Sequence, residues 1–157
     1  MTKFLLSLHV LAAIIAVGPV AVAASMFPRV LRQARDPSGA GDTSASNQLH
    51  LLHRVCRVYA AIGMAVPVFG FATASNLGVL GSAWLISAIA LTAVAAAVLM
   101  LRILPGQQAA LTDLAEPAGA TGTTLSTRLA MDTGVFNLLW ATVTVLMIIR
   151  PGSTTGA

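Results

Sequence analysis

The sequence predicts an all-α, polytopic membrane protein in which four transmembrane helices form a bundle. The first observation is compositional: 57% of the 157 residues are hydrophobic, only 9% are charged, and the mean hydropathy is +0.85. A soluble domain has about 25% charged residues, so this chain has too few to cover a surface in water. The second observation is that the apolar residues form long charge-free segments, and a bilayer-spanning helix needs roughly 20 mainly apolar residues.

The first and the last predicted spans are each one charge-free segment. The first covers residues 4–27 and ends at "FPR", where Pro28 is expected to break the helix. The last covers residues 133–149 and lies between Asp132 and Arg150.

The second and the third spans come from one longer apolar segment. Residues 58–101 carry no charge, but 44 residues are too many for a single crossing. The turn formers in "SNLGVLGS", residues 75–82, divide the segment. We therefore expect a helical hairpin with spans at 58–74 and 83–101.

Two polar segments, residues 28–57 and 102–132, are expected to be connecting loops within a single membrane domain, 1–157. They hold seven arginines, whereas the opposite side has only Lys3 and Arg150. The positive-inside rule therefore places both loops in the cytoplasm and both termini outside. A composition rich in Ala, Gly and Arg favours a bacterial plasma membrane. A cleaved signal peptide is the alternative for the first span, because Lys3, the apolar run and "AVAAS" resemble one.

His9 stands within the first apolar segment, about 9 Å inside its outer boundary at 1.5 Å per residue. An imidazole at that depth stays neutral and requires a partner. Three interpretations are open: an interhelical hydrogen bond, a haem or metal ligand, or direct proton chemistry. Met147 lies at a similar depth in the last span, where it would either pack against its neighbours or supply a second axial ligand. A five-coordinate haem held by His9 alone is a further option.

Basic residues gather around the first polar segment, where we expect contact with anionic lipid headgroups or an acidic partner. Nucleic acid is excluded as a partner, because no aromatic residues alternate with the cations. The arginines expected to make these contacts are Arg29, Arg32, Arg35, Arg54 and Arg57.

His50, His53, Arg54 and Arg57 are expected to share one helical face. His50, His53 and Cys56 have a three-residue spacing that would suit a metal, but no carboxylate lies nearby to complete a site. We therefore predict no metal site and no catalytic residues. Cys56 is the single cysteine, so no intrachain disulfide can form.

Two further contacts are expected between or along the helices. Ala93 and Ala97, four residues apart, form a small-residue stripe that would let another helix approach closely. Asp132 lies one turn after Arg128 and is expected to pair with it at the membrane boundary.

Several short motifs together resemble a group of small bacterial four-helix membrane proteins. The motifs are "SLHVLAA", "FPRV", "HRVCRVYA" and "FNLLWATVTVLMIIRPG". The nearest members form an uncharacterised family, and more distant relatives include the CopD-like copper-resistance proteins and the haem-containing membrane protoporphyrinogen oxidase. In the oxidase family the first-helix histidine binds haem, and His9 occupies the matching place. That family also has a lysine after a tryptophan in its third helix, whereas "SAWLISAIALT" contains no lysine here.

The sequence therefore favours a structural or accessory component of a membrane assembly. The reasons are the lack of embedded charge and the small-residue faces. One alternative is a membrane oxidoreductase that binds haem b and is related to protoporphyrinogen oxidase, and a weaker one is a copper or small-solute transporter. The expected partners are membrane lipids, together with another membrane protein or a second copy of the chain.

Overall fold

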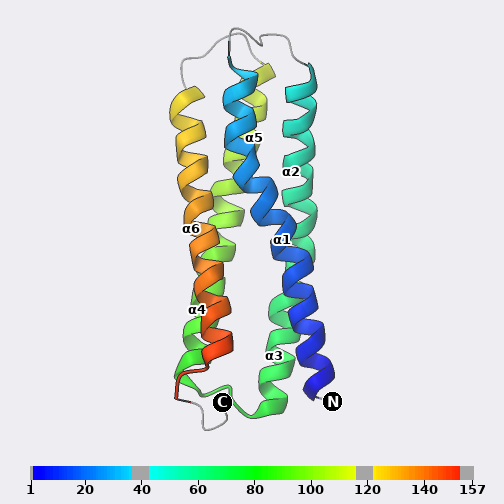
Figure 1. The fold of residues 1–157 in the computed structure, drawn as a ribbon, viewed down its shortest axis with the longest axis vertical. Coiled ribbons are helices and arrows are strands. Elements are labelled where there is room, and N and C mark those ends of the chain that lie inside the picture. Colours follow the sequence, from blue (N-terminus) through cyan, green and yellow to red (C-terminus); the bar gives the residue numbers. More distant parts are fainter. Residues whose placement is uncertain (1, 37–42, 116–121, 153–157) are drawn as a thin grey trace.

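The structure, a computed structural model, describes residues 2–36, 43–115 and 122–152, and within these residues it contains helices and no strand (Figure 1). Four long helical segments run up and down as a four-helix bundle, which confirms the predicted fold class. In chain order, the elements are α1 (Thr2–Ala34), α2 (Thr43–Gly63), α3 (Ala65–Leu77), α4 (Ala83–Val98), a π-helical segment (Leu99–Ile103), α5 (Leu104–Ala115) and α6 (Gly122–Ile149).

Each of the four segments is long and apolar enough to cross a membrane. They contain 32, 35, 33 and 26 residues. At 1.5 Å per residue these lengths correspond to about 39–52 Å, whereas the hydrocarbon core of a bilayer is only about 30 Å thick. The helices therefore extend well beyond the thickness of the hydrocarbon layer.

The expectation that Pro28 ends the first helix is wrong, because α1 continues to Ala34. Phe27 and Leu31 on either side of the proline are both fully buried. Burying a large apolar side chain contributes about 1.5–3 kcal/mol, so two such residues offset the roughly 3 kcal/mol that an internal proline costs. The polar segments 28–57 and 102–132, expected as loops, are likewise largely helical.

The turn predicted between the second and third spans is confirmed, although it is shorter than expected. α3 continues to Leu77, and Gly78 ends it with φ of 67°. Glycine fits this left-handed position because it has no Cβ. The Ser82 hydroxyl donates to the Val79 carbonyl at 2.7 Å, which closes the turn before α4.

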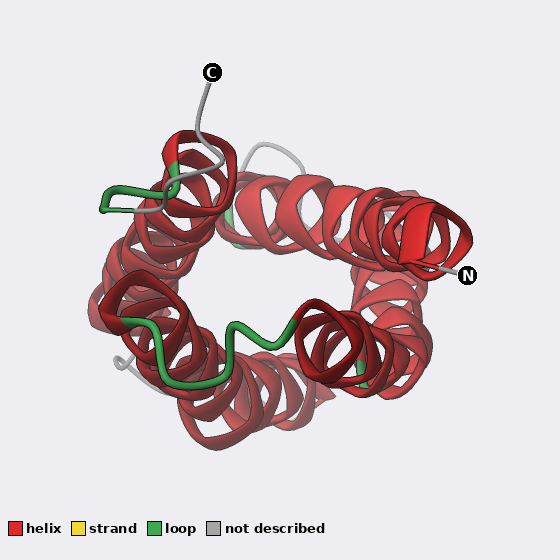
Figure 2. Cartoon of the chain, turned by 90° about the horizontal axis from the view of Figure 1, so that it is seen from below, coloured by secondary structure: helices red, strands yellow, loops and turns green. Residues whose placement is uncertain are grey.

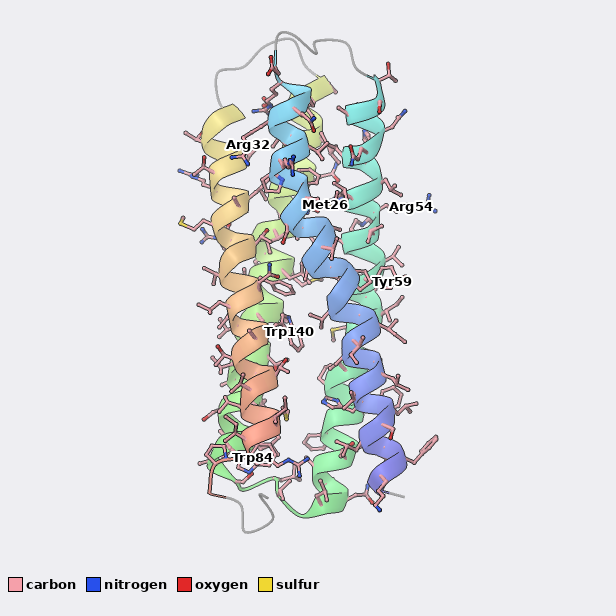
Figure 3. All side chains as sticks on the ribbon, in the orientation of Figure 1. Met26, Arg32, Arg54, Tyr59, Trp84 and Trp140 are labelled. Carbon is pink, nitrogen blue, oxygen red and sulfur yellow. The ribbon has the colours of Figure 1, made fainter. Side chains whose placement is uncertain are left out.

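The bundle has two ends of different chemistry. Lys3 and Arg150 lie at one end, and the seven other arginines lie in the opposite part, some of them at its boundary with the first. We define the arginine end as residues 27–36, 43–57, 102–115 and 122–132, and the terminal end as residues 3–26, 58–101 and 133–150. Figure 3 shows Arg32 and Arg54 in the first part and Trp84 near the limit of the second.

Exposed apolar side chains are distributed very unevenly between these ends. Of 26 large apolar side chains exposed among the described residues, only Leu51 and Met131 lie at the arginine end. The other 24 lie at the terminal end, where the helices are long enough to match a bilayer. Contiguous apolar surface of this kind marks contact with a membrane or with other proteins. The arginine end instead has a polar exterior around an apolar core, as a water-exposed bundle has.

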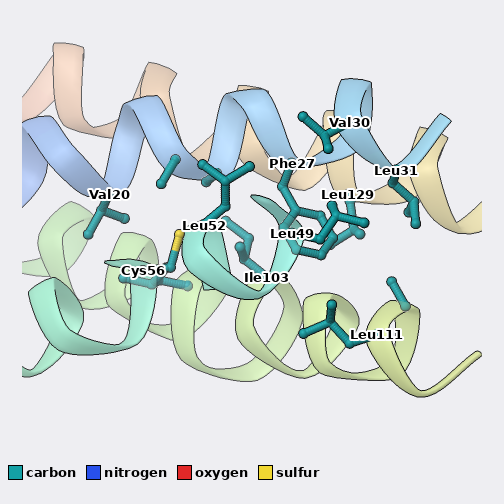
Figure 4. Packing of buried hydrophobic residues seen from close by; sticks show 14 of the residues in the cluster. Val20, Phe27, Val30, Leu31, Leu49, Leu52, Cys56, Ile103, Leu111 and Leu129 are labelled. Atoms are coloured by element: carbon teal, nitrogen blue, oxygen red, sulfur yellow. The ribbon is translucent and has the colours of Figure 1, made fainter. Parts of the chain in front are cut away.

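The main hydrophobic core extends through the arginine end into the middle of the bundle. Phe27, Leu49 and Ile103 are fully buried there and come from α1, α2 and the π-helical segment (Figure 4). The core also includes Leu129 of α6 and Leu111 of α5. All four long segments are therefore joined by one apolar cluster at this end.

The terminal end is packed differently, because its helices associate mainly as two pairs. α3 packs mainly on α1, and α4 packs mainly on α6. The view from below shows the two pairs on different sides of the bundle axis (Figure 2). None of the described residues of α1 before Ala16 is fully buried. A smaller cluster of Ala74, Trp84 and Leu85 closes the base near the α3–α4 turn.

The small residues of α4 that pack inside the bundle are not the ones predicted. Ala93 and Ala97 are exposed, whereas Ala88 and Ala95 are fully buried. Ala95 belongs to the main core, where its small side chain lets α4 lie close to its neighbours.

Candidate functional site

His9 forms an interhelical hydrogen bond, one of the three roles considered for it. Its Nδ1 donates to the Val66 carbonyl oxygen at 2.9 Å, so the ring joins α1 to α3. The site is partly buried and lies at the terminal end. Gly70, one turn after Val66, faces the ring. A Cβ at position 70 would lie only 2.8 Å from His9 Cε1 and 3.0 Å from Nδ1, so the absence of a side chain there makes room for the imidazole.

The bond to Val66 determines the role of one ring nitrogen. A carbonyl oxygen can only accept, so Nδ1 donates, and in a neutral imidazole the lone pair is then on Nε2. Metal-binding histidines commonly have this arrangement, with one ring N–H held by a backbone carbonyl and the other nitrogen directed at the metal. In this arrangement Nε2 is the ring nitrogen that does not contact Val66.

Met147, the other residue considered as a haem ligand, packs in a different environment. It lies against the small cluster of Ala74, Trp84 and Leu85, near the end of α6. α1 and α6 diverge toward this end of the bundle (Figures 1 and 2). Met147 thus makes the packing contacts of one of the two roles considered for it.

A buried polar network at the arginine end joins α2 to α5. His53 Nδ1 donates to Gln107 Oε1 at 3.1 Å, and Gln107 Nε2 donates to Cys56 Sγ at 3.5 Å. All three side chains are buried. Sequence reasoning did not identify Gln107, because a glutamine in a polar segment is normally exposed and only its position on the inner face of α5 reveals its role.

The set His50, His53 and Cys56 does not come together in the structure. His50 is exposed, whereas His53 and Cys56 face the core. His53 consequently does not share the exposed face of Arg54 and Arg57, contrary to expectation. No cluster of three or more His, Cys, Asp or Glu side chains suited to a metal occurs within 2–36, 43–115 and 122–152.

Four of the five arginines expected to meet headgroups or an acidic partner are exposed. The fifth, Arg35, is partly buried and pairs with Asp113 at 2.5 Å, which joins the end of α1 to α5. The exposed residues are Arg29, Arg32, Arg54 and Arg57.

The ion pair expected between Asp132 and Arg128 is wrong. Asp132 instead pairs with Arg102, whose Nε donates to Oδ2 at 3.3 Å and lies 3.2 Å from Oδ1. The partner comes from the π-helical segment, thirty residues away in the sequence. Arg128 forms no ion pair with any residue that the structure describes.

One face of α6 carries three buried polar atoms that have no hydrogen-bond partner among the described residues. They are Thr133 Oγ1, Asn137 Oδ1 and Trp140 Nε1. Their spacing of four and then three residues places them in one row. Asn137 also donates from Nδ2 to Ser25 Oγ at 3.1 Å, so the row meets α1. Buried polar atoms normally have a protein or water partner, so this row is a suitable place for ordered water between helices.

Comparisons of the chain with protein-family models, with curated proteins and with solved structures find no match. The resemblance to CopD-like proteins and to protoporphyrinogen oxidase therefore depends on the quoted sequence motifs alone.

Proposed function

We propose that this chain is a non-enzymatic accessory component of a membrane assembly, with its terminal end in the lipid and its arginine end in the cytoplasm. The observation that carries the proposal is that the interior polar side chains bond one helix to another. His9, the His53–Gln107–Cys56 network and Arg35 each form a bond that joins two helices. Such bonds hold a bundle in one arrangement.

The apolar exterior of the terminal end supports a partner chain. Ile14 and Phe71 are exposed there by 65% and 60%. An apolar helix of another membrane protein, or of a second copy, would cover surface of this kind.

Photo-crosslinking in the membrane tests this proposal. A photoreactive residue at Ile14 or Phe71 is expected to join the chain to another polypeptide. The same probe at exposed Gln48, at the arginine end, serves as the matched control. Adducts with lipid alone at Ile14 and Phe71, together with the mass of a monomer in native mass spectrometry, would contradict an accessory role.

A second candidate, a haem-binding membrane protein, is favoured by one specific observation. The Nδ1–H of His9 is held by the Val66 carbonyl, which in a neutral imidazole leaves the lone pair of Nε2 for a ligand. His9 would hold haem through this nitrogen, and the haem would supply redox chemistry when bound.

The visible spectrum of the purified protein distinguishes the two candidates. Haem binding predicts a Soret band that His9→Ala removes and that Met147→Ala leaves unchanged, because Met147 packs elsewhere. A protein without this band, after expression with ample haem supply, would exclude the haem candidate and leave the accessory role.

A further inference from the structure

The pocket on the outside of the bundle at the boundary between its two ends is lined by charged side chains. Its volume is about 460 Å³, within the range of about 300–1,000 Å³ common for small-molecule sites. Arg102, Arg128 and Asp132 supply its polar lining, and Leu101, Leu125 and Leu129 supply its apolar walls. The pocket therefore combines two guanidinium groups and one carboxylate with an apolar wall.

Local backbone structure shapes this pocket. Arg102 lies in the π-helical segment, where the Leu104 N–H bonds to the Leu99 carbonyl five residues earlier. Pro105 follows at once and cannot donate to Leu101, which suits a widened turn at this point. At position 106 a Cβ would lie 2.8 Å from Leu129 Cδ2, so Gly106 allows α5 to approach α6 closely. Arg102 and Arg128 thereby face the same space from two helices.

The charge of the pocket is not balanced. Arg102 contacts Asp132 through Nε, and the guanidinium has four further N–H donors. Its side chain is 61% exposed, so these donors are accessible. Arg128 adds a second guanidinium that pairs with no carboxylate in the described part of the chain. The three groups together have a net charge of +1, which favours an anion with several acceptor oxygens.

The height of the pocket matches the surface of a bilayer. Arg102 lies 19 residues after the start of α4, and Arg128 lies 21 residues before the end of α6. At 1.5 Å per residue these separations are about 28 Å and about 32 Å, close to the roughly 30 Å of the hydrocarbon core. Leu101, which is 75% exposed, lies at the same level beside the guanidinium groups.

We infer that this pocket binds the phosphodiester group of an anionic phospholipid. The two arginines hold the phosphate oxygens, and the acyl chains run along Leu101 toward the terminal end. Asp132 orients Arg102 and, by its own charge, limits the affinity for the anion. The inference depends on the membrane placement in the proposed function and not on the accessory role, so a monomeric, partner-free protein would leave it intact.

The test is the dissociation constant of phosphatidylglycerol for the full chain in neutral detergent, measured by native mass spectrometry. Arg128→Gln is expected to weaken binding by about ten-fold, because charge-assisted hydrogen bonds are roughly twice as strong as neutral ones. Arg128→Lys keeps the charge but loses the planar fork, so its affinity for the lipid should lie between those of the native chain and Arg128→Gln. Lys3→Gln is the matched control, since it also removes one positive charge and Lys3 is exposed at the terminal end, outside the pocket.

Asp132→Asn is expected to change the dissociation constant in the opposite direction. This variant distinguishes binding in the pocket from a general attraction of the lipid to surface charge. Removing the carboxylate should tighten phosphatidylglycerol binding by about two- to five-fold, because the like charge disappears. Equal losses in Arg128→Gln and Lys3→Gln would overturn the site, as would weaker binding in Asp132→Asn. Inorganic phosphate at the same concentration should not displace the lipid, and if it does, the assignment to a lipid is wrong.

Discussion

Gly70→Ala is the sharpest test of the contact between His9 and α3. The new Cβ would meet His9 Cε1 at 2.8 Å and Nδ1 at 3.0 Å. Carbon atoms pack best at about 3.5–4.0 Å, so the ring has to retreat by roughly 0.7–1.2 Å. Its hydrogen bond to Val66, now 2.9 Å, would then exceed the usual limit of about 3.2 Å for an N–H···O bond.

Two opposing effects determine how much Gly70→Ala changes the free energy of unfolding. Alanine is more favourable than glycine within a helix by about 0.5–1 kcal/mol. Losing an interhelical hydrogen bond in a membrane costs about 0.6–1.7 kcal/mol, and crowding a packed site adds about 1–3 kcal/mol. Gly134→Ala in α6 isolates the first effect, because no atom lies within 4 Å of its Cβ position. We expect Gly70→Ala to be less stable than Gly134→Ala by about 2 kcal/mol.

The measurement is reversible unfolding in mixed micelles, carried out in the native and His9→Ala backgrounds. With the imidazole removed, the difference between Gly70→Ala and Gly134→Ala should fall to within about 0.5 kcal/mol, because distant, unshared changes add within that error. If Gly70→Ala is as harmless as Gly134→Ala, or if its cost persists without His9, the ring does not occupy the place described here.

Three further predictions concern the core and the orientation. Gln107→Leu leaves His53 and Cys56 without their buried partner and should cost about 1–3 kcal/mol in chemical unfolding, whereas Gln108→Leu on the exposed face should change stability by about 0.5 kcal/mol or less. Ala95→Leu overfills the core and should lower stability by about 1–3 kcal/mol, while Ala93→Leu on the exposed face should not, and equal tolerance would remove the assigned face. A cysteine at Ser44 should resist an impermeant thiol reagent in intact cells and react after permeabilisation, and labelling in intact cells would reverse the orientation. Thr121, a second position for this probe, lies outside the described residues.

The sequence alone determined the fold class and the positions of the apolar segments. Charge-free segments long enough to cross a bilayer have one low-energy solution in lipid, a helix whose backbone polar groups bond internally. The turn around Gly78 was also predictable, because a left-handed residue that ends a helix favours glycine. Both conclusions depend on local chemistry that the amino-acid order specifies directly.

The extent of the helices was decided by tertiary packing. Local rules end α1 at Pro28, but burial of Phe27 and Leu31 by other helices carries it on to Ala34. The two polar segments were predicted as loops because their local composition also does not reveal tertiary contacts. Residues 43–57 have a low average hydropathy, and only their contact with α1 and α5 turns one face into core.

The pairing of polar side chains could not be predicted, because it depends on which helices become neighbours. Asp132 has Arg128 within one turn on its own helix, yet it bonds to Arg102 on the neighbouring helical segment. The need of His9 for a partner was clear from its depth in an apolar segment. The identity of the partner, the Val66 carbonyl beside Gly70, was decided only by the packing of α1 against α3. Nothing in the sequence positions of Val66 and Gly70 indicates a contact with His9.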